Sequence, residues 1–196
     1  MKLAKSIGRL GTETAFEVLA KAKKLEAQGK EIIHLEIGEP DFETPDHIKE
    51  AAKKALDDNY THYVPSPGLM EVREVIAEHQ SKVHNKNISP ENVVFTPGAK
   101  PIMFFTIMAL IEPGDEVIYP NPGFPIYESM INYVGGKAVP MELKEEKDFN
   151  ADVDLIEESI TDRTKLIILN SPNNPCGSVM EPSDIKRIAD IAKQKD

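Results

Sequence analysis

The sequence has a single cysteine, Cys176, among its 196 residues, so no disulfide can form within the chain. Its cysteine and histidine spacings do not resemble a zinc site. It also lacks an apolar run long enough to cross a bilayer, and no apolar stretch of signal-peptide length follows its basic start. These absences favour a reducing, cytoplasmic setting, with no metal and no membrane partner expected.

Basic residues are outnumbered: 23 Lys and Arg stand against 33 Asp and Glu, which gives a formal net charge of −10 and a pI near 5.1. A nucleic-acid partner requires a basic surface that matches the phosphate backbone, so nucleic acid is not expected as a partner. A small anion remains possible because backbone dipoles can bind one locally. The proportions of hydrophobic residues (40%) and charged residues (29%) are typical of a globular protein.

The first part of the chain predicts helices joined by turns. An amphipathic pattern predicts a helix over residues 12–29, and a short strand-like piece covers residues 32–35. We expect Thr44 to cap a second helix with Pro45 at its first position, and a third helix to follow Gly68 and run to about Val83.

From residue 92 onward, short apolar runs alternate with helical patterns. Strands are predicted over residues 93–95, 117–119, 137–141 and 166–169, and helices over residues 102–111, 126–133, 153–160 and 182–193. Apolar strands joined by helices indicate an α/β fold with a mostly parallel sheet that has helices on both faces. Ligands of such sheets bind at the carboxyl ends of the strands, so the loops after the strands are the candidate site.

The loop at residues 96–101 contains Gly98, Ala99 and Lys100 directly before a helix. Small residues let the backbone approach a ligand, and the amino end of a helix suits a phosphate. Taken alone, however, small residues before a helix more often form an ordinary tight turn, and Lys100 is more often a surface lysine.

Two other loops carry groups that suit a planar ligand. Phe124 follows the second predicted strand and can stack on a ring, although, taken alone, an ordinary core phenylalanine is the favoured explanation. Three asparagines and two prolines occur within residues 170–177, after the fourth predicted strand. They supply amide donors on a fixed backbone, or form a plain turn.

Six short blocks together resemble the class I/II aminotransferases, which are fold-type I enzymes that depend on pyridoxal 5'-phosphate. The blocks occur in family order: GEPDF (38–42), YVPSPGLMEVR (63–73), TPGAK (96–100), PGDEV (113–117), NPGF (121–124) and SPNNPCG (171–177). Each block is weak alone, but their shared order and spacing extend the resemblance over residues 12–196.

The resemblance implies roles for residues already selected. Gly98 and the backbone amides of Ala99 and Lys100 would hold the cofactor phosphate. Phe124 would stack on the pyridine ring, and Asn174 would hydrogen-bond its phenolic oxygen.

The resemblance also implies that the site extends beyond one chain. Tyr63 would reach the phosphate from a neighbouring subunit, which implies a homodimer, and Gly38 would meet the substrate carboxylate. Residues 1–44 would form an N-terminal arm and small-domain segment, and residues 45–196 the first half of the large cofactor-binding domain. Cys176 stands where the family usually has threonine, a change that alters local hydrogen bonding and leaves the turn intact.

Several family residues have no counterpart in this sequence: the lysine that forms the Schiff base, the aspartate at the pyridine nitrogen and the arginine that binds the substrate carboxylate. In the family these residues lie further along the chain, and later strands insert between the first and fourth strands predicted here. We therefore expect the 196 residues to be the first half of an enzyme that transfers an amino group between an amino acid and a 2-oxo acid. The rest would be lost or supplied separately, and this chain alone would be inactive.

Three alternatives remain open: a lyase of the same family, a non-catalytic module for cofactor binding or dimerisation, and an unrelated phosphate or nucleotide binder. The motifs do not reveal which amino acid is the substrate.

Overall fold

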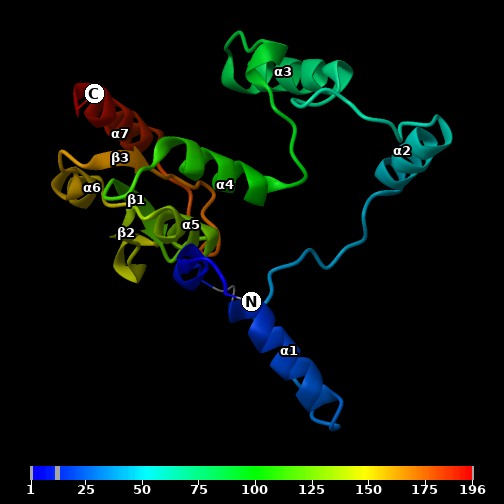
Figure 1. The fold of residues 1–196 in the computed structure, drawn as a ribbon, viewed down its shortest axis with the longest axis horizontal. Coiled ribbons are helices and arrows are strands. Elements are labelled where there is room, and N and C mark those ends of the chain that lie inside the picture. The colour runs from blue at the N-terminus through cyan, green and yellow to red at the C-terminus, as the bar shows by residue number, and fades with distance from the viewer. Residues whose placement is uncertain (1, 12–13, 196) are drawn as a thin grey trace. The chain divides into compact units, whose positions relative to one another are not determined.

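The computed structural model of the protein describes residues 2–11 and 14–195 (Figure 1). Contacts within the chain divide it into two compact units. The first comprises the described residues up to Thr14 together with those from Lys100 onward, and the second is Ala15–Ala99. The expected boundary between residues 44 and 45 stays a prediction.

The first unit is built on a three-stranded sheet in the order β2-β1-β3, in which β1 pairs with both neighbours in parallel. Its strands are β1 (Glu116–Asn121), β2 (Lys137–Glu142) and β3 (Thr164–Ile167). Its α-helices are α4 (Ala99–Leu110), α5 (Ile126–Val134), α6 (Val153–Ser159) and α7 (Pro182–Lys195), accompanied by the short 3-10 helices η1 (Lys5–Arg9) and η3 (Glu145–Lys147). The predicted parallel α/β architecture is confirmed.

Strand β1 is the centre of this unit, and all of its residues except Asn121 are buried. Successive side chains of a strand point to opposite faces. Ile118 joins a core formed mainly with α6 and α7, whereas Val117 and Tyr119 join a second core with α4 and α5. The helices therefore cover both faces of the sheet, and β1 belongs to both cores.

Close backbone packing fixes the turn between α5 and β2. Gly135 ends α5 with a φ of 91°, the left-handed conformation that favours glycine. A Cβ on the next residue, Gly136, would lie 2.8 Å from a methyl carbon of Ile111 at the end of α4. Glycine at both positions therefore lets β2 begin directly against the α4 layer.

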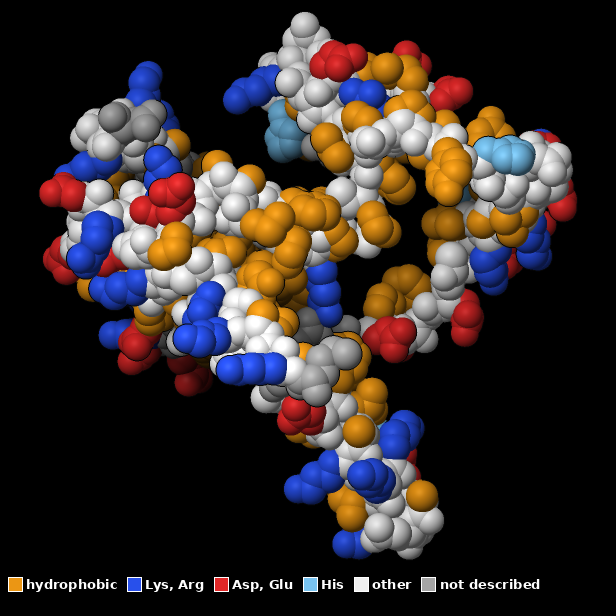
Figure 2. Space-filling model, in the orientation of Figure 1, with side chains coloured by type: hydrophobic (Ala, Val, Ile, Leu, Met, Phe, Trp, Pro, Cys, Tyr) orange, Lys and Arg blue, Asp and Glu red, His pale blue; other side chains and the backbone are white. Residues whose placement is uncertain are grey.

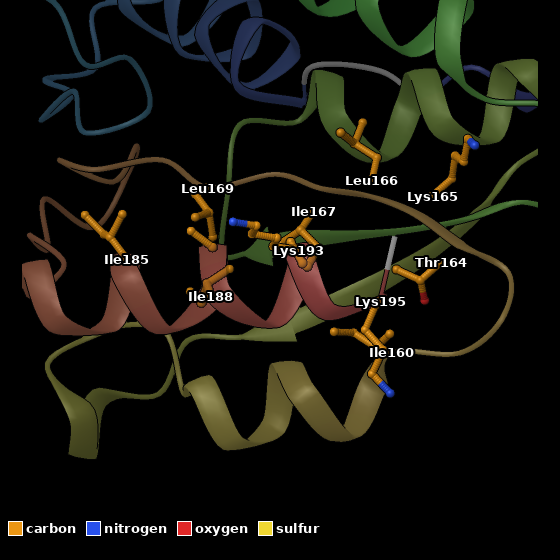
Figure 3. A pocket seen from close by; sticks show the side chains of 12 residues that line it. Ile160, Thr164, Lys165, Leu166, Ile167, Leu169, Ile185, Ile188, Lys193 and Lys195 are labelled. Atoms are coloured by element: carbon orange, nitrogen blue, oxygen red, sulfur yellow. The ribbon is translucent and has the colours of Figure 1, made fainter. Parts of the chain in front are cut away.

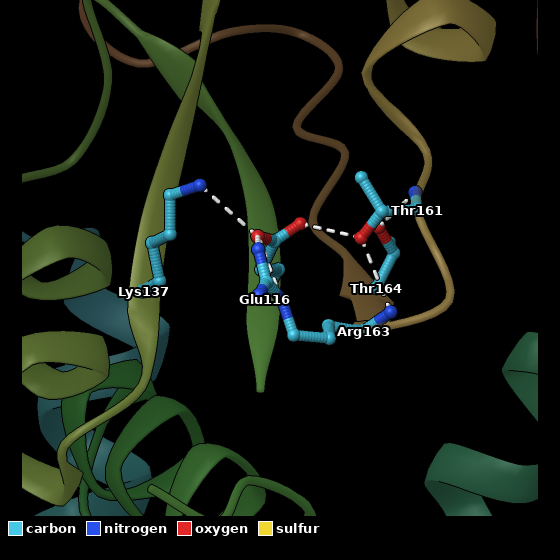
Figure 4. Close-up of polar contacts among 5 residues, drawn as sticks. All are labelled: Glu116, Lys137, Thr161, Arg163 and Thr164. Atoms are coloured by element: carbon cyan, nitrogen blue, oxygen red, sulfur yellow. Dashed lines mark hydrogen bonds and ion pairs between the residues drawn. The ribbon is translucent and has the colours of Figure 1, made fainter. Parts of the chain in front are cut away.

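The amino end of the sheet is fastened by the carboxylate of Glu116, which is almost fully buried (Figure 4). It accepts hydrogen bonds from Lys137 Nζ at 3.0 Å, Arg163 Nη2 at 2.7 Å and Thr161 Oγ1 at 2.7 Å. Lys137 begins β2, and Arg163 directly precedes β3, so one side chain ties together all three strands. The hydrogen bonds from Thr161 and from the two cations lower the pKa of Glu116 to about 2.

Strand β3 lies at one edge of the sheet and is shifted from its predicted range of residues 166–169. The observed strand spans Thr164–Ile167, and its register shifts by one residue at Lys165, since Glu116 pairs with Thr164 and Val117 with Leu166. Beyond the strand, the Ile168 N–H still donates to the Ile118 carbonyl at 2.8 Å. A cavity of about 610 Å³ opens between this strand and α7 (Figure 3). Its walls are mainly apolar and include Ile167, Leu169 and Ile188.

The second unit contains α1 (Thr14–Glu26), α2 (Asp46–Asp57), α3 (Met70–His84) and the 3-10 helix η2 (Pro90–Asn92). Two predicted strands, residues 32–35 and 93–95, are wrong. The described sheet includes neither segment, and an extended segment becomes a strand only through a pairing partner. Ile33 and Leu35 are instead 85% and 90% exposed.

Helix boundaries in this unit also differ from the expectation. Pro45, not Thr44, is the N-cap of α2, and no side-chain hydrogen bond caps this helix. The predicted helix over residues 12–29 is observed from Thr14 to Glu26, and its first two positions lie outside the described residues.

The inward face of α3 contains Arg73 and Ala77, both buried, whereas Val72 and Val75 are exposed. On the first unit, α4 exposes Ile102, Phe105 and Met108, and Figure 2 shows hydrophobic side chains gathered over this helix. Exposed apolar side chains on α3 and on α4 are of the kind that further polypeptide normally covers.

We expect Glu116→Gln to lower the midpoint temperature of unfolding by several degrees at pH 7. Folding lowers the pKa of Glu116 from its ordinary 4.5 to about 2, so its contribution is complete above pH 4.5 and is lost as the pH falls towards 2. When unfolding is measured between pH 7 and pH 2, the difference in midpoint temperature between the wild type and Glu116→Gln should therefore shrink as the pH falls. Glu142→Gln, which alters an exposed carboxylate on β2, is the control. A gap independent of pH would contradict the assignment.

Candidate functional site

The turn before α4 is closed by two short-range hydrogen bonds. Gly98 has a φ of 90°, its N–H donates to the Thr96 carbonyl at 2.8 Å, and Thr96 Oγ1 donates to the Gly98 carbonyl at 2.7 Å. Ala99 then begins a helix of 12 residues. The first turn of any such helix directs backbone N–H groups, and the positive end of the helix dipole, towards its amino end.

There is room for a ligand at this turn. A Cβ placed on Gly98 would meet no atom within 4 Å, so the space beside its backbone is open. Backbone N–H donors with a helix dipole and a neighbouring Lys100 form a donor set that suits a phosphate. The residues present therefore fit the phosphate of pyridoxal phosphate.

Lys100 and Phe124 are brought together, although 24 positions separate them in sequence. Lys100 Nζ lies 5.8 Å from the centroid of the Phe124 ring. Phe124 also packs edge-to-face on Tyr127, with 5.9 Å between ring centroids and an interplanar angle of 89°. Tyr127 is buried, and burial raises the pKa of its hydroxyl. Phe124 is thus a partly buried aromatic ring held beside the amino end of α4.

The loop after β3 is held by its own asparagines. Asn173 is buried, and its side-chain oxygen accepts from the Cys176 N–H at 3.2 Å, while its carbonyl accepts from the Gly177 N–H at 2.7 Å. Asn170 Oδ1 accepts from the backbone N–H of Asn174 at 2.9 Å. Asn174 itself is exposed, so its amide side chain is displayed by a loop that other residues fix.

Both loops lie at the same edge of the sheet. Strands β1 and β3 are parallel, so the loops that follow them leave from the same end. Pro120 near the end of β1 and Asn170 and Asn173 in the loop after β3 line the same small cavity. The first unit therefore gathers Lys100, Phe124 and the loop of Asn174 at the carboxyl end of its sheet, as the strand pattern predicts.

Gly38 and Tyr63 belong to the second unit. Gly38 lies in an irregular, exposed segment, and the side chain of Tyr63 is fully exposed. Their roles towards a substrate and across a subunit interface stay predictions.

Two residues of structural importance near the site had no role in the sequence-based prediction. Asn173 fixes the loop that displays Asn174, and Arg73 is buried against the chain that leads to Gly98. Both residues lie in sequence blocks that carry the family resemblance, and this is the sign in the sequence that they are important. A sequence does not reveal that an arginine on a polar helix faces inward.

Among the described residues, no group of three or more His, Cys, Asp or Glu side chains could hold a metal ion. No helix in the described parts of the chain is long and apolar enough to cross a membrane.

Comparisons with known proteins point to one family. The family model for aminotransferase class I and II matches residues 30–196. The probable aspartate/prephenate aminotransferase of Aquifex aeolicus is 41% identical over 193 residues, which cover 98% of this chain and 49% of that protein. The probable aspartate aminotransferase of Methanocaldococcus jannaschii is 47% identical over 161 residues, which cover 82% of this chain and 42% of that protein.

Solved structures of aminotransferases are also similar to this chain. The aspartate aminotransferase of Thermus thermophilus with maleate has a TM-score of 0.94 at 36% identity, covering 100% of this chain and 51% of that one. The alanine aminotransferase of Pyrococcus furiosus has a TM-score of 0.93 at 34% identity, covering 99% of this chain and 50% of that one. The chain spans about half the length of the curated relatives it matches.

We expect Gly123→Ala to destabilise the loop that holds Phe124. A Cβ at Gly123 would clash with the Pro120 carbonyl oxygen, so the backbone must shift, at a cost of about 1–3 kcal/mol. Urea unfolding measures this loss. Gly8→Ala, where a Cβ meets nothing within 4 Å, is the matched control and should change the free energy of unfolding by less than about 0.5 kcal/mol. Equal stability of the two variants would refute the close approach.

Proposed function

This chain belongs to the aminotransferase class I and II family, and we propose that it is the N-terminal half of a pyridoxal-5'-phosphate-dependent aminotransferase. The complete enzyme would transfer an amino group between an amino acid and a 2-oxo acid. The observation that carries the proposal is the placement of Lys100, in the first turn of α4, 5.8 Å from the Phe124 ring at the carboxyl end of β1.

The residues of this chain would bind and orient the cofactor. Backbone amides at Gly98, Ala99 and Lys100 would hold its phosphate, and the face of Phe124 would pack on its ring. The exposed amide of Asn174 would donate to the phenolic oxygen. Bound pyridoxal phosphate supplies an electron-withdrawing ring that stabilises negative charge at the substrate's α carbon.

The rest of the site would come from other polypeptide. Gly38 would meet the substrate carboxylate through its backbone, and Tyr63 would reach the phosphate of a second subunit, so the complete enzyme would be a homodimer. The exposed tyrosine hydroxyl is compatible with such a role. A cytoplasmic location, suggested by the single cysteine, is part of the same proposal.

The second half of the enzyme would complete the sheet. The cavity along β3 and α7 is lined by apolar side chains, and an unpaired edge of this kind requires cover. A strand from polypeptide equivalent to the remaining half of the relatives would supply that cover and the lysine that the chemistry needs. The chain alone would therefore lack activity.

We expect the full-length protein, but not this chain, to transfer an amino group to a 2-oxo acid when pyridoxal phosphate is present. Aspartate and alanine are the donors to test first, because relatives are named for them. Product formation measured by chromatography decides the outcome. Elimination products instead would indicate the lyase alternative, and cofactor binding without turnover would indicate the non-catalytic module.

In the full-length protein, Asn174→Ala should slow transfer about tenfold or more, since an unmade hydrogen bond to a buried group costs about 1–3 kcal/mol. Its thermal stability should not change, because the side chain is exposed. Asn173→Ala is the contrasting variant: it removes the acceptor of the Cys176 N–H and should lower the midpoint temperature of unfolding. Full activity of Asn174→Ala would exclude its role.

A further inference from the structure

Within the described parts of the chain, the segment that leads to the phosphate-binding turn has no strand partner. Residues 93–95 lie outside the described sheet. Gly98, which directly precedes α4, follows Val93 by five residues. Something other than a strand ladder has to hold this segment.

Arg73 supplies that hold from α3. Its Nε donates to the carbonyl oxygens of Val93 at 2.9 Å and Pro90 at 3.1 Å, and its Nη2 donates to the Pro90 carbonyl at 2.7 Å. The guanidinium is a planar fork, so it can bind two carbonyls at once, which an ammonium group does less well. Both carbonyls belong to the chain directly before the turn.

The interaction depends on carbonyls more than on an ion pair. The Arg73 side chain is only 7% exposed, whereas Glu91, whose carboxylate lies 3.6 Å away, is 79% exposed. A buried charge is costly unless its donors are satisfied, so the two carbonyls are what keep Arg73 in place. The same contact keeps the carbonyls in place.

A second contact fixes the segment two residues further on. The Phe95 N–H donates to the Pro67 carbonyl at 2.8 Å, and a Cβ on Gly68 would lie 2.9 Å from the Phe95 Cβ. Residues 67–73 therefore grip residues 90–95 at two points. The chain that reaches Gly98 leaves from a fixed position.

We propose that Arg73 is a positioning residue for the phosphate-binding turn: by holding Pro90 and Val93 it orients the backbone amides of Gly98 and Ala99 before the phosphate arrives. Donors fixed in advance bind more tightly, because less conformational entropy is lost on binding. Arg73 itself would not touch the cofactor. This inference rests on the proposed function.

The test compares two ligands of the full-length protein, pyridoxal phosphate and pyridoxal, which lacks the phosphate. Arg73→Met should weaken pyridoxal phosphate about tenfold or more in fluorescence titrations and leave the dissociation constant of pyridoxal unchanged. Arg73→Lys should fall between Arg73→Met and the wild type. Glu91→Gln, which keeps the carbonyl contacts, is the matched control and should match the wild type in both titrations.

Amide hydrogen exchange of the protein without cofactor gives an independent readout. Arg73→Lys should speed exchange at the Phe95 amide and leave exchange in β1 unchanged. Equal weakening of both ligands, or unchanged affinity for pyridoxal phosphate, would overturn the role of Arg73. A wild-type protein that binds no pyridoxal phosphate would instead refute the proposed function, with the exchange result still deciding whether Arg73 holds the segment.

Discussion

The described α/β unit depends on its central strand β1, which contacts the rest of the unit on both faces, at both edges and at its amino end. Its side chains alternate between two helix-covered cores, with Ile118 on one face and Val117 and Tyr119 on the other. Its two edges are paired in parallel to β2 and β3. At its amino end Glu116 is buried and charged, and Lys137, Arg163 and Thr161 converge on it. Strand β1 therefore sets the register of the sheet. A shift of β1 by one residue would turn each of its side chains to the opposite face and move the Glu116 carboxylate away from its three partners.

The candidate site follows from the same constraint. Parallel pairing brings the loops after β1 and β3 to one edge, and the packing of α4 on β1 brings Lys100 to that edge beside Phe124. Each group assigned to the proposed site is supported by a neighbouring residue: Tyr127 packs on Phe124, Asn173 fixes the loop of Asn174, and Arg73 holds the segment before Gly98. A binding site on loops obtains its accuracy from such supports.

The proposal that this chain is one half of a longer enzyme accounts for features that would be unusual in an isolated domain. The apolar cavity beside β3, the exposed apolar face of α4 and the exposed Ile33 and Leu35 are surfaces that a folded protein normally covers. The relatives are about twice as long as this chain, so in the proposed enzyme a segment of comparable length would be available to cover these surfaces.

The sequence by itself determined the alternation of strands and helices from residue 99 onward, the parallel α/β class and the three loops that form the candidate site. These features depend on local periodicity and on turn residues, which the sequence displays directly. Only the tertiary structure decided that residues 93–95 and 32–35 are not strands, that α3 turns Arg73 inward, that Asn173 fixes the loop while Asn174 is displayed, and that Glu116 joins three strands. Each of these depends on a partner far away in the chain: a strand needs a neighbour to pair with, and a buried charge needs the carbonyls or cations that the fold brings to it.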